Sequence, residues 1–387
     1  MYNFDEHIDR RGTYCVKWDA LEERYGTEDA LAMWVADSDF KSPPAVVDRL
    51  VKRAQHGIFG YTACTDEFYD AFIHWMQRRH NFDIQKEWVT TTPGIVAAIN
   101  FTIHALTEPG DKIIIQSPVY PPFFNSVKTN GRILVENPLI EKDNTYEMDF
   151  DNFEKNIDDK TKMLILCNPH NPIGRVWTKE ELTRLGDICV EKDILVLSDE
   201  IHSDLILKGY KHTPFASLSK ALQDRTISCY APSKTFNVAG LSASVAVIPN
   251  PEIREKFINF TDSIGVHSLT VFGIEALIAC YEEGEDWLEA QLDYLQGNID
   301  YVNSYLKDNL PEIKAFHMEG TYLLWLDCRQ LNLSQEALER FFINDVKVAL
   351  NSGTAFGTTG TGFMRVNMAT NRKRIEQFLN QLKTAKL

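Results

Sequence analysis

The spacing of hydrophobic residues predicts an amphipathic helix over residues 65–80. Its apolar positions recur every three or four residues and share one face: Phe68, Ala71, Phe72, Trp75 and Met76. Acidic residues lie near the start of this segment and basic residues close it, an arrangement that suits the helix dipole. We therefore expect a helix whose inner face packs against a core.

A capping box predicts the start of another helix at Thr178. Glu181 follows Thr178 at the required distance, and the next apolar residues would face inward: Leu182, Leu185, Ile188 and Cys189. The same reasoning places helices over residues 97–106 and 374–386 and a strand over residues 322–327.

Short apolar runs separate the predicted helices. These runs occupy residues 112–116, 163–167, 194–198, 226–230 and 244–248. Continuous apolar runs that alternate with helices predict a mainly parallel sheet covered on both faces. The expected fold class is therefore α/β, in which ligands bind beyond the carboxyl ends of the strands.

Residues with catalytic potential follow the predicted strands. Tyr120, Asn171, Asp199 and Lys234 come after four successive apolar runs. Because the carboxyl ends of parallel strands meet at one edge of a sheet, we expect these four side chains to lie together. Gly94-Ile95 stands where another strand leads into the helix over 97–106, and the free N–H groups of a helix start bind phosphate well.

These are the residue types needed to hold pyridoxal 5'-phosphate (PLP). Lys234 would form an imine with the cofactor aldehyde, since a lysine at a strand end has its amine partly desolvated. Asp199 would pair with the protonated pyridine nitrogen and keep the ring an electron acceptor. Asn171 would donate a hydrogen bond to the phenolate oxygen, and Tyr120 would lie over one face of the ring.

Each of these residues alone also has an ordinary explanation. A lysine after a strand can reach into water, and a lone aspartate more often caps a helix or forms a salt bridge. An Asn-Pro pair forms turns in any case, and an aromatic residue can cover the end of a sheet. The pattern favours PLP because the residues occur together.

Composition narrows the function classes. The chain has 387 residues and a formal net charge of -15, which argues against nucleic acid or an anionic membrane as a partner. Seven cysteines without a C-x-x-C pair favour the cytoplasm. We expect no signal peptide, transmembrane helix or metal site, and the chain lacks the G-x-S-x-G motif of many hydrolases.

In its motifs the chain resembles the fold-type I PLP enzymes, the aspartate aminotransferase superfamily. Within that superfamily it is similar to the MalY/PatB group of cystathionine β-lyase-type C–S lyases. The resemblance runs over nearly the whole chain and rests on five stretches: residues 33–37 (Met-Trp-Val-Ala-Asp), 59–62, 167–174, 198–204 and 231–241. The subgroup rests on the first stretch, on His202 and on the Ser-Lys-Thr-Phe-Asn turn.

The resemblance implies an aspartate-aminotransferase-like fold with two domains. A large PLP-binding domain with a mainly parallel sheet would span residues 48–285. A smaller α+β domain would combine residues 1–47 with 286–387. The family forms homodimers with a shared active site, in which Tyr61 would reach the phosphate bound by the neighbouring subunit. Without the resemblance, Tyr61 is an ordinary half-buried aromatic residue.

Further site residues follow from the same resemblance. Arg365 matches the arginine that clamps the substrate α-carboxylate through two parallel bonds, although without the family context a structural ion pair would be favoured. Ala36 and Asn171 would also contact the substrate. Ser233 and His202 would contact the cofactor.

Two positions depart from the pattern of many aminotransferases. Ala231 and Ser242 stand where those enzymes carry a serine and an arginine for the phosphate. Phosphate binding would therefore depend on Ser233, Gly94-Ile95 and Tyr61.

The resemblance implies α,β-elimination from a cysteine S-conjugate, which releases a thiol, pyruvate and ammonia. Lys234, Asp199 and Tyr120 would be the catalytic residues, with Lys234 as the general base. An aminotransferase that uses the same residues is the main alternative, and a PLP-binding regulator is a further one. The substrate stays open among cystathionine, S-alkyl cysteines, cysteine itself and a peptide with an N-terminal cysteine conjugate.

Overall fold

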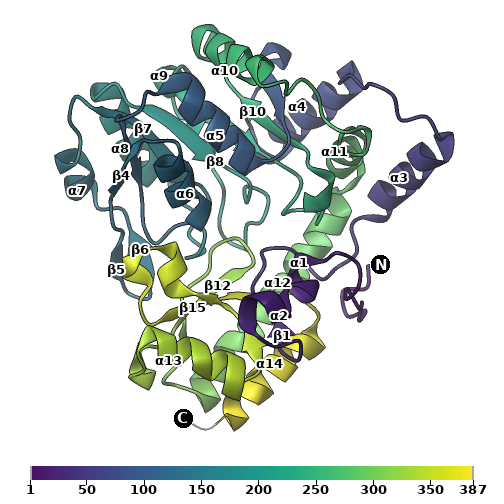
Figure 1. The fold of residues 1–387 in the computed structure, drawn as a ribbon, viewed down its shortest axis with the longest axis vertical. Coiled ribbons are helices and arrows are strands. Elements are labelled where there is room, and N and C mark those ends of the chain that lie inside the picture. The colour runs from purple at the N-terminus through teal and green to yellow at the C-terminus, as the bar shows by residue number, and fades with distance from the viewer. Residues whose placement is uncertain (1, 386–387) are drawn as a thin grey trace.

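The computed structural model describes residues 2–385. A seven-stranded sheet forms its centre, in the order β2-β10-β9-β8-β7-β3-β4 (Figure 1). Its strands are β2 (Val89–Thr92), β10 (Ser244–Val247), β9 (Thr226–Tyr230), β8 (Leu195–Asp199), β7 (Thr161–Cys167), β3 (Lys112–Ile115) and β4 (Ile133–Glu136). All neighbours pair in parallel except β10, which is antiparallel to both β2 and β9. The predicted mainly parallel α/β sheet is confirmed.

Helices cover both faces of this sheet because its strands are apolar on both sides. Ile113 and Ile115 of β3 pack toward one helix layer, whereas Ile114 between them packs toward the other. The first layer contains α5 (Ile95–Leu106), α6 (Pro121–Thr129) and α10 (Pro251–Ser263). The second contains α4 (Asp66–His80), α8 (Lys179–Glu191) and α11 (Val271–Glu283), and α3 (Pro44–His56) packs on the outside of α11.

Two helix predictions can be compared with the structure directly. The predicted inner face of α4 is buried, including Phe68, Phe72 and Trp75. The predicted capping box of α8 is present, with Thr178 accepting from the Glu181 amide and the Glu181 side chain accepting in return. Both predictions are confirmed.

A second, antiparallel sheet lies below the first in Figure 1. Its order is β11-β12-β15-β14, with β11 (Lys314–Ala315), β12 (Leu323–Asp327), β15 (Phe363–Asn367) and β14 (Asn351–Ser352). Three helices flank it: α12 (Glu285–Asn309), α13 (Gln335–Arg340) and α14 (Arg372–Thr384). The predicted final helix matches α14, although Lys386 lies outside the described residues.

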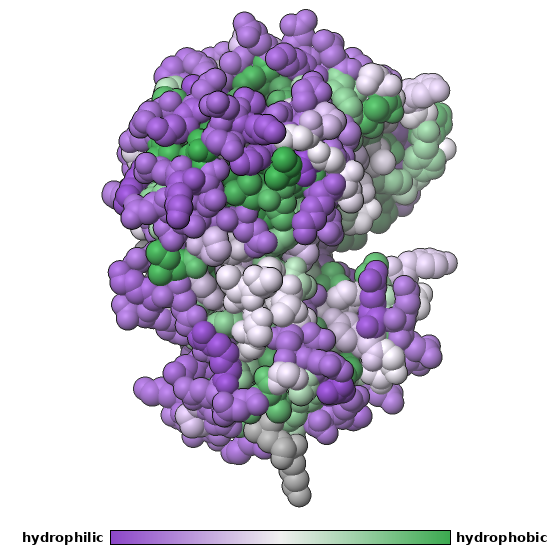
Figure 2. Space-filling view, turned by 60° about the vertical axis from the view of Figure 1, so that its left-hand side comes forward, coloured by the Kyte–Doolittle hydropathy of each residue, from purple (hydrophilic) through white to green (hydrophobic). Residues whose placement is uncertain are grey.

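The N-terminal segment joins this second sheet region. Its helices α1 (Val16–Asp19) and α2 (Leu21–Tyr25) are followed by β1 (Leu31–Ala32), which pairs in parallel with β13 (Val348–Ala349). The surface is hollowed at mid-height, between the part that contains the large sheet and the part that contains the small sheet (Figure 2). The pairing of β1 with β13 is consistent with a small domain built from both chain ends. The domain boundaries at residues 48 and 285 stay a prediction.

One hydrophobic core nevertheless contains residues from both proposed domains. The ring of Trp287 on α12 lies 5.6 Å from that of Phe4 and 6.1 Å from that of Phe236, measured between centroids. Phe236 in turn contacts Trp75 of α4.

The remaining helices and strands of the proposed large domain are short: α7 (Phe150–Lys155), α9 (Lys220–Gln223) and the hairpin of β5 (Ile140–Lys142) and β6 (Thr145–Glu147). No helix within residues 2–385 has the length and apolarity that crossing a membrane requires.

Candidate active site

A cavity of about 330 Å³ opens at the carboxyl ends of β7, β8 and β9. It brings together all the predicted site residues except Arg365 and Tyr61: Ala36, Gly94, Ile95, Tyr120, Asn171, Asp199, His202, Ser233 and Lys234. Strand ends of the large sheet position most of these residues because the strands stop at the same edge, whereas Ala36 comes from the N-terminal segment. The expectation that they meet at this edge is therefore met.

Lys234 lies in the turn that follows β9. Its Nζ donates a hydrogen bond to the Ala36 carbonyl oxygen at 2.6 Å. The next residue, Thr235, is anchored to buried Asp204 at 3.1 Å. Burial lowers the pKa of Lys234 to about 8, with Arg365 acting in the same direction and the carboxylates of Asp37 and Asp199 opposing. A lysine of this kind is a usable nucleophile and base near neutral pH.

Asp199 is the last residue of β8 and is buried. Its Oδ1 accepts a hydrogen bond from the Ile201 amide at 3.1 Å. Burial raises the pKa of Asp199 to about 7, although this hydrogen bond and the charge of Lys234 oppose the shift. A buried carboxylate with so few partners is stabilised by a cation placed beside it. The protonated pyridine nitrogen of PLP is such a cation.

Arg365 of β15 reaches the cavity wall through Asn171. Its Nη1 donates to Asn171 Oδ1 at 3.0 Å, and its Nη2 donates to Asn351 Oδ1 at 2.6 Å and to the Trp34 carbonyl at 2.8 Å. Burial lowers the pKa of Arg365 to about 10. Within residues 2–385 every hydrogen bond of this guanidinium goes to a neutral oxygen, and its Nε has no partner. Arg365 is therefore not the structural ion pair that was the alternative, and its charge is available to a carboxylate.

Tyr120 and His202 complete the cavity wall. Tyr120 lies directly before α6, and burial raises the pKa of its hydroxyl. Burial, together with the charges of Lys234 and Arg365, lowers the pKa of His202 to about 3, so the imidazole is neutral at pH 7. In the described part of the chain the Nδ1 of His202 has no hydrogen-bond partner. This nitrogen can donate or accept a hydrogen bond, depending on the tautomer, with a group bound in the cavity.

The start of α5 fits a phosphate group. Gly94 is its N-cap residue, and among the described residues no side chain caps the helix. A Cβ atom added at Gly94 would meet no atom within 4 Å outside its chain neighbours, and residues 93–97 line the cavity, so there is room for a group at the helix start. Free N–H groups at an open helix start are a general phosphate site. Ser233 and Ser242 line the same cavity.

Tyr61 is the one predicted site residue that lies apart from the cavity. Its relative exposure of 111% in the single chain means that no neighbouring side chain covers it. Its proposed contact with the phosphate in another subunit stays a prediction.

Several cavity residues were missed by sequence reasoning. Cys167 and Ile201 line the cavity beside predicted residues, and their positions at strand ends were an available signal. Tyr322 donates from its hydroxyl to the Ala36 carbonyl at 3.1 Å, and Asn351 bonds Arg365. No sequence pattern marks these last two residues.

Comparison with known proteins places the chain in a family. Residues 33–382 match the model of the aminotransferase class I and II family. Cystathionine beta-lyase PatB of Bacillus subtilis (strain 168) is 44% identical over 384 residues, which cover 99% of each chain. The cystalysin structure from Treponema denticola, described as containing PLP, superposes with a TM-score of 0.96 at 39% identity and covers 99% of this chain and 98% of that one.

A third comparison gives the same result. The PLP-bound C–S lyase structure from Staphylococcus hominis has a TM-score of 0.92 and 34% identity, over 99% of this chain and 97% of that one. The resemblance expected from the motifs is confirmed. The chain belongs to the aminotransferase class I and II family, in the branch that contains PatB and the C–S lyases.

Proposed function

We propose that this protein is a PLP-dependent C–S β-lyase that cleaves cystathionine or other S-substituted cysteines to a thiol, pyruvate and ammonia. The observation that carries this proposal is the meeting of Lys234 and Asp199 in one cavity, whose wall residue Asn171 is bonded by Arg365, a guanidinium without an acidic partner among the described residues. The family membership gives the same reaction class, which the sequence motifs had predicted.

The residues around the cavity fit PLP. Asp199 would hold the pyridine nitrogen, Asn171 and His202 would face the phenolate oxygen, and the amides at Gly94-Ile95 would hold the phosphate. Tyr120 would lie against the ring. When bound, PLP accepts the electrons that the breaking Cα–H bond releases.

Arg365 would orient the substrate through its α-carboxylate. A guanidinium can form two parallel charge-assisted hydrogen bonds to a carboxylate, which fix both position and angle. With the carboxylate held there, Lys234 Nζ removes the proton from the substrate Cα. A thiolate is a good leaving group at Cβ, so its departure requires no dedicated acid.

The rate should depend on the protonation of Lys234. Because Lys234 acts as a neutral base and its pKa is about 8, kcat is expected to rise as the pH increases through 8. Below that pH the amine carries the proton that it must accept. Initial rates between pH 6 and pH 10 with a cysteine S-conjugate test this.

A substrate deuterated at Cα provides the control. A primary isotope effect on kcat shows that proton removal limits the rate, and a kcat that then stays constant across the range contradicts the role of Lys234.

Pyruvate release decides between a lyase and an aminotransferase. The holoenzyme should release pyruvate and a thiol from cystathionine in equal amounts when no keto acid is added. Turnover that requires a keto-acid acceptor and yields no free thiol would instead establish an aminotransferase. A panel of S-alkyl cysteines and an N-terminal cysteine conjugate then ranks the substrates.

The active site would be completed by a second subunit in a homodimer. Apolar side chains on α3 and in the loop that follows it are exposed in the single chain: Val47, Val51, Ile58, Phe59 and Tyr61. Such a patch is typical of a protein interface. It carries the tyrosine that would reach the phosphate in the partner.

Mixed dimers test the shared site. Lys234→Ala and Tyr61→Ala subunits are each expected to be impaired alone. When equal amounts of the two variants dissociate and reassociate at random, about half of the dimers are heterodimers, and each heterodimer has one site with both residues intact. About a quarter of the wild-type activity should therefore return. No recovery, with heterodimers detected by mass, would place Tyr61 in the site of its own subunit.

We place the protein in the cytoplasm. Its seven cysteines, all within the described residues, are free thiols and most are buried. Unpaired thiols suit a reducing compartment.

A further inference from the structure

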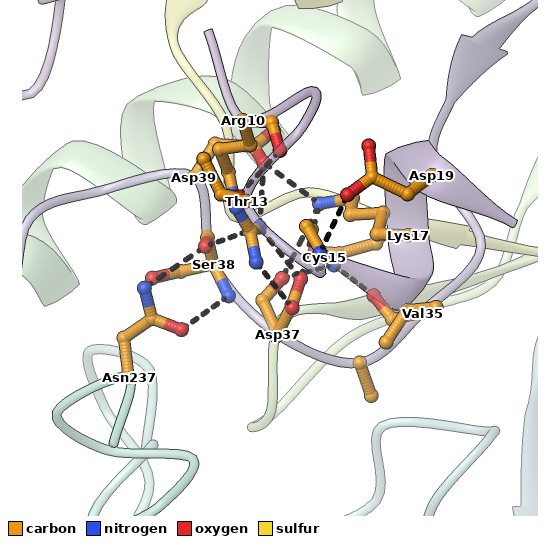
Figure 3. Close-up of polar contacts among 12 residues, drawn as sticks. Arg10, Thr13, Cys15, Lys17, Asp19, Val35, Asp37, Ser38, Asp39 and Asn237 are labelled. Atoms are coloured by element: carbon orange, nitrogen blue, oxygen red, sulfur yellow. Dashed lines mark hydrogen bonds and ion pairs between the residues drawn. The ribbon is translucent and has the colours of Figure 1, made fainter. Parts of the chain in front are cut away.

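A cluster of charged residues joins the N-terminal segment to α14. The N-terminal ion cluster consists of Arg10, Lys17, Asp37, Asp39 and Arg374 (Figure 3 shows the first four). Arg10 forms two bonds with the Asp37 carboxylate, at 3.0 and 2.7 Å, and a third with Asp39 at 3.0 Å. Lys17 Nζ lies 3.2 Å from Asp39 and 3.6 Å from Asp37.

The inner half of the cluster is deeply buried. The side chains of Lys17 and Asp39 are 1% and 2% exposed. Burial would raise the pKa of Asp39, but Lys17, Arg374, Arg10 and a hydrogen bond with Thr370 together outweigh it and hold the pKa well below its usual range. Arg374 Nη1 lies 2.7 Å from Asp39 Oδ2 as a close ion pair. Buried charges are retained at a substantial desolvation cost, which points to a specific geometric role.

The cluster binds the stretch of backbone that touches the catalytic residues, since Lys17 Nζ donates to the Asp37 carbonyl oxygen at 3.3 Å. Within residues 34–37, the Trp34 carbonyl accepts from Arg365 and the Ala36 carbonyl accepts from Lys234. The Nδ2 of Asn367 on β15 donates to the other two carbonyl oxygens of the stretch, those of Val35 and Asp37, each at 2.6 Å.

The residues that directly follow this stretch are bound from the proposed large domain. Asn237, three residues after Lys234, donates to the Ser38 carbonyl at 3.0 Å and accepts from the Ser38 amide (Figure 3). It also donates to the Phe40 carbonyl at 2.8 Å. The N-terminal segment is thus tied to the lysine turn on one side and to β15 on the other.

We propose that Arg10 and Asp37 are positioning residues for this reaction, in which Arg10 both fixes the 34–37 backbone and neutralises the charge of Asp37, the residue next to the Ala36 carbonyl that Lys234 binds. The inference rests on the proposed role of Lys234. Through these contacts the N-terminal segment would set the geometry and the proton affinity of the active-site lysine, although Arg10 lies far from Lys234 in the sequence.

The electrostatic sign can be derived from the groups around Lys234. Asp37 and Asp199 favour its protonated form, whereas Arg365 disfavours it. His202 and Tyr322, which also lie beside it, are neutral at pH 7 because burial lowers the pKa of the first and raises that of the second. Asp37 itself faces Arg10 and Lys17. Removing the Arg10 charge therefore favours a proton on the lysine nitrogen, and removing the Asp37 charge disfavours it.

Two substitutions with opposite expected effects test this. The readout is the pH at which the visible absorption band of PLP bound to the full-length enzyme changes. We expect this midpoint to rise in Arg10→Gln and to fall in Asp37→Asn, each by on the order of 0.5 pH unit. Arg10→Lys keeps the charge and should restore most of the midpoint. Displacement of the backbone should also lower kcat/KM in Arg10→Gln roughly tenfold.

Arg79→Gln is the matched control. Arg79 has the same side-chain exposure as Arg10, 19%, and also pairs with two carboxylates, Glu285 and Glu289. Its replacement should leave the midpoint and kcat/KM unchanged.

The outcomes separate this inference from the proposed function. Opposite shifts in the two cluster variants support the positioning role. Midpoints that shift in the same direction in both variants, or that do not shift, refute the positioning role. If the wild-type enzyme still shows the visible band, the proposed function is unaffected by that result. A wild-type chain that develops no band with PLP refutes both.

Discussion

Replacing Lys234 with alanine is expected to remove the visible absorption band of the purified protein and to lower pyruvate release by at least about 10³-fold. Lys234 is the amine in the cavity that faces Asp199, and its pKa of about 8 suits both imine formation and proton removal. The loss combines the missing covalent attachment and the missing base. Absorbance spectra and a coupled pyruvate assay measure the two effects separately.

Lys220→Ala is a suitable control for this experiment. Lys220 lies on the surface in α9 and pairs only with Asp224 within the described residues, so its loss should leave both readouts unchanged. A Lys234→Ala protein that folds, keeps its band and still releases pyruvate at the wild-type rate would exclude Lys234 as the cofactor lysine.

Replacing Arg365 with lysine is expected to raise KM for cysteine S-conjugates by roughly 10- to 100-fold. Lysine keeps the positive charge but cannot form two parallel bonds to a carboxylate. It also loses at least one of the bonds that Arg365 makes to Asn171, Asn351 and the Trp34 carbonyl. Steady-state kinetics on the variant, checked for folding by circular dichroism, give the change in KM.

A substrate without the carboxylate separates binding from general damage. The wild-type enzyme should strongly prefer an S-substituted cysteine over the matching S-substituted cysteamine. This preference should largely disappear in Arg365→Lys. If the variant keeps the full preference, another group binds the carboxylate.

The elements of the large sheet were predictable because their pattern is local. The apolar runs matched β3, β7, β8, β9 and β10 to within about two residues, and the residues after them met at one edge. The antiparallel direction of β10 was not predictable from its sequence, since a buried strand of either direction gives the same apolar run.

Long-range pairings were beyond the reach of the sequence. The pairing of β1 with β13 joins segments more than 300 residues apart. The partners of Arg365 include Asn351 and a backbone carbonyl, which no motif marks. Lys17 and Asp39 read as ordinary surface charges until the fold buries them together.

The aromatic contacts between Phe4, Trp287 and Phe236 bear on how this enzyme folds. Since residues of both proposed domains, Trp287 of the long connecting helix among them, build one shared core, neither domain can complete its interior without the other. Calorimetry of the full chain should therefore record one cooperative melting transition, and an excised fragment of residues 48–285 should not remain monomeric and folded.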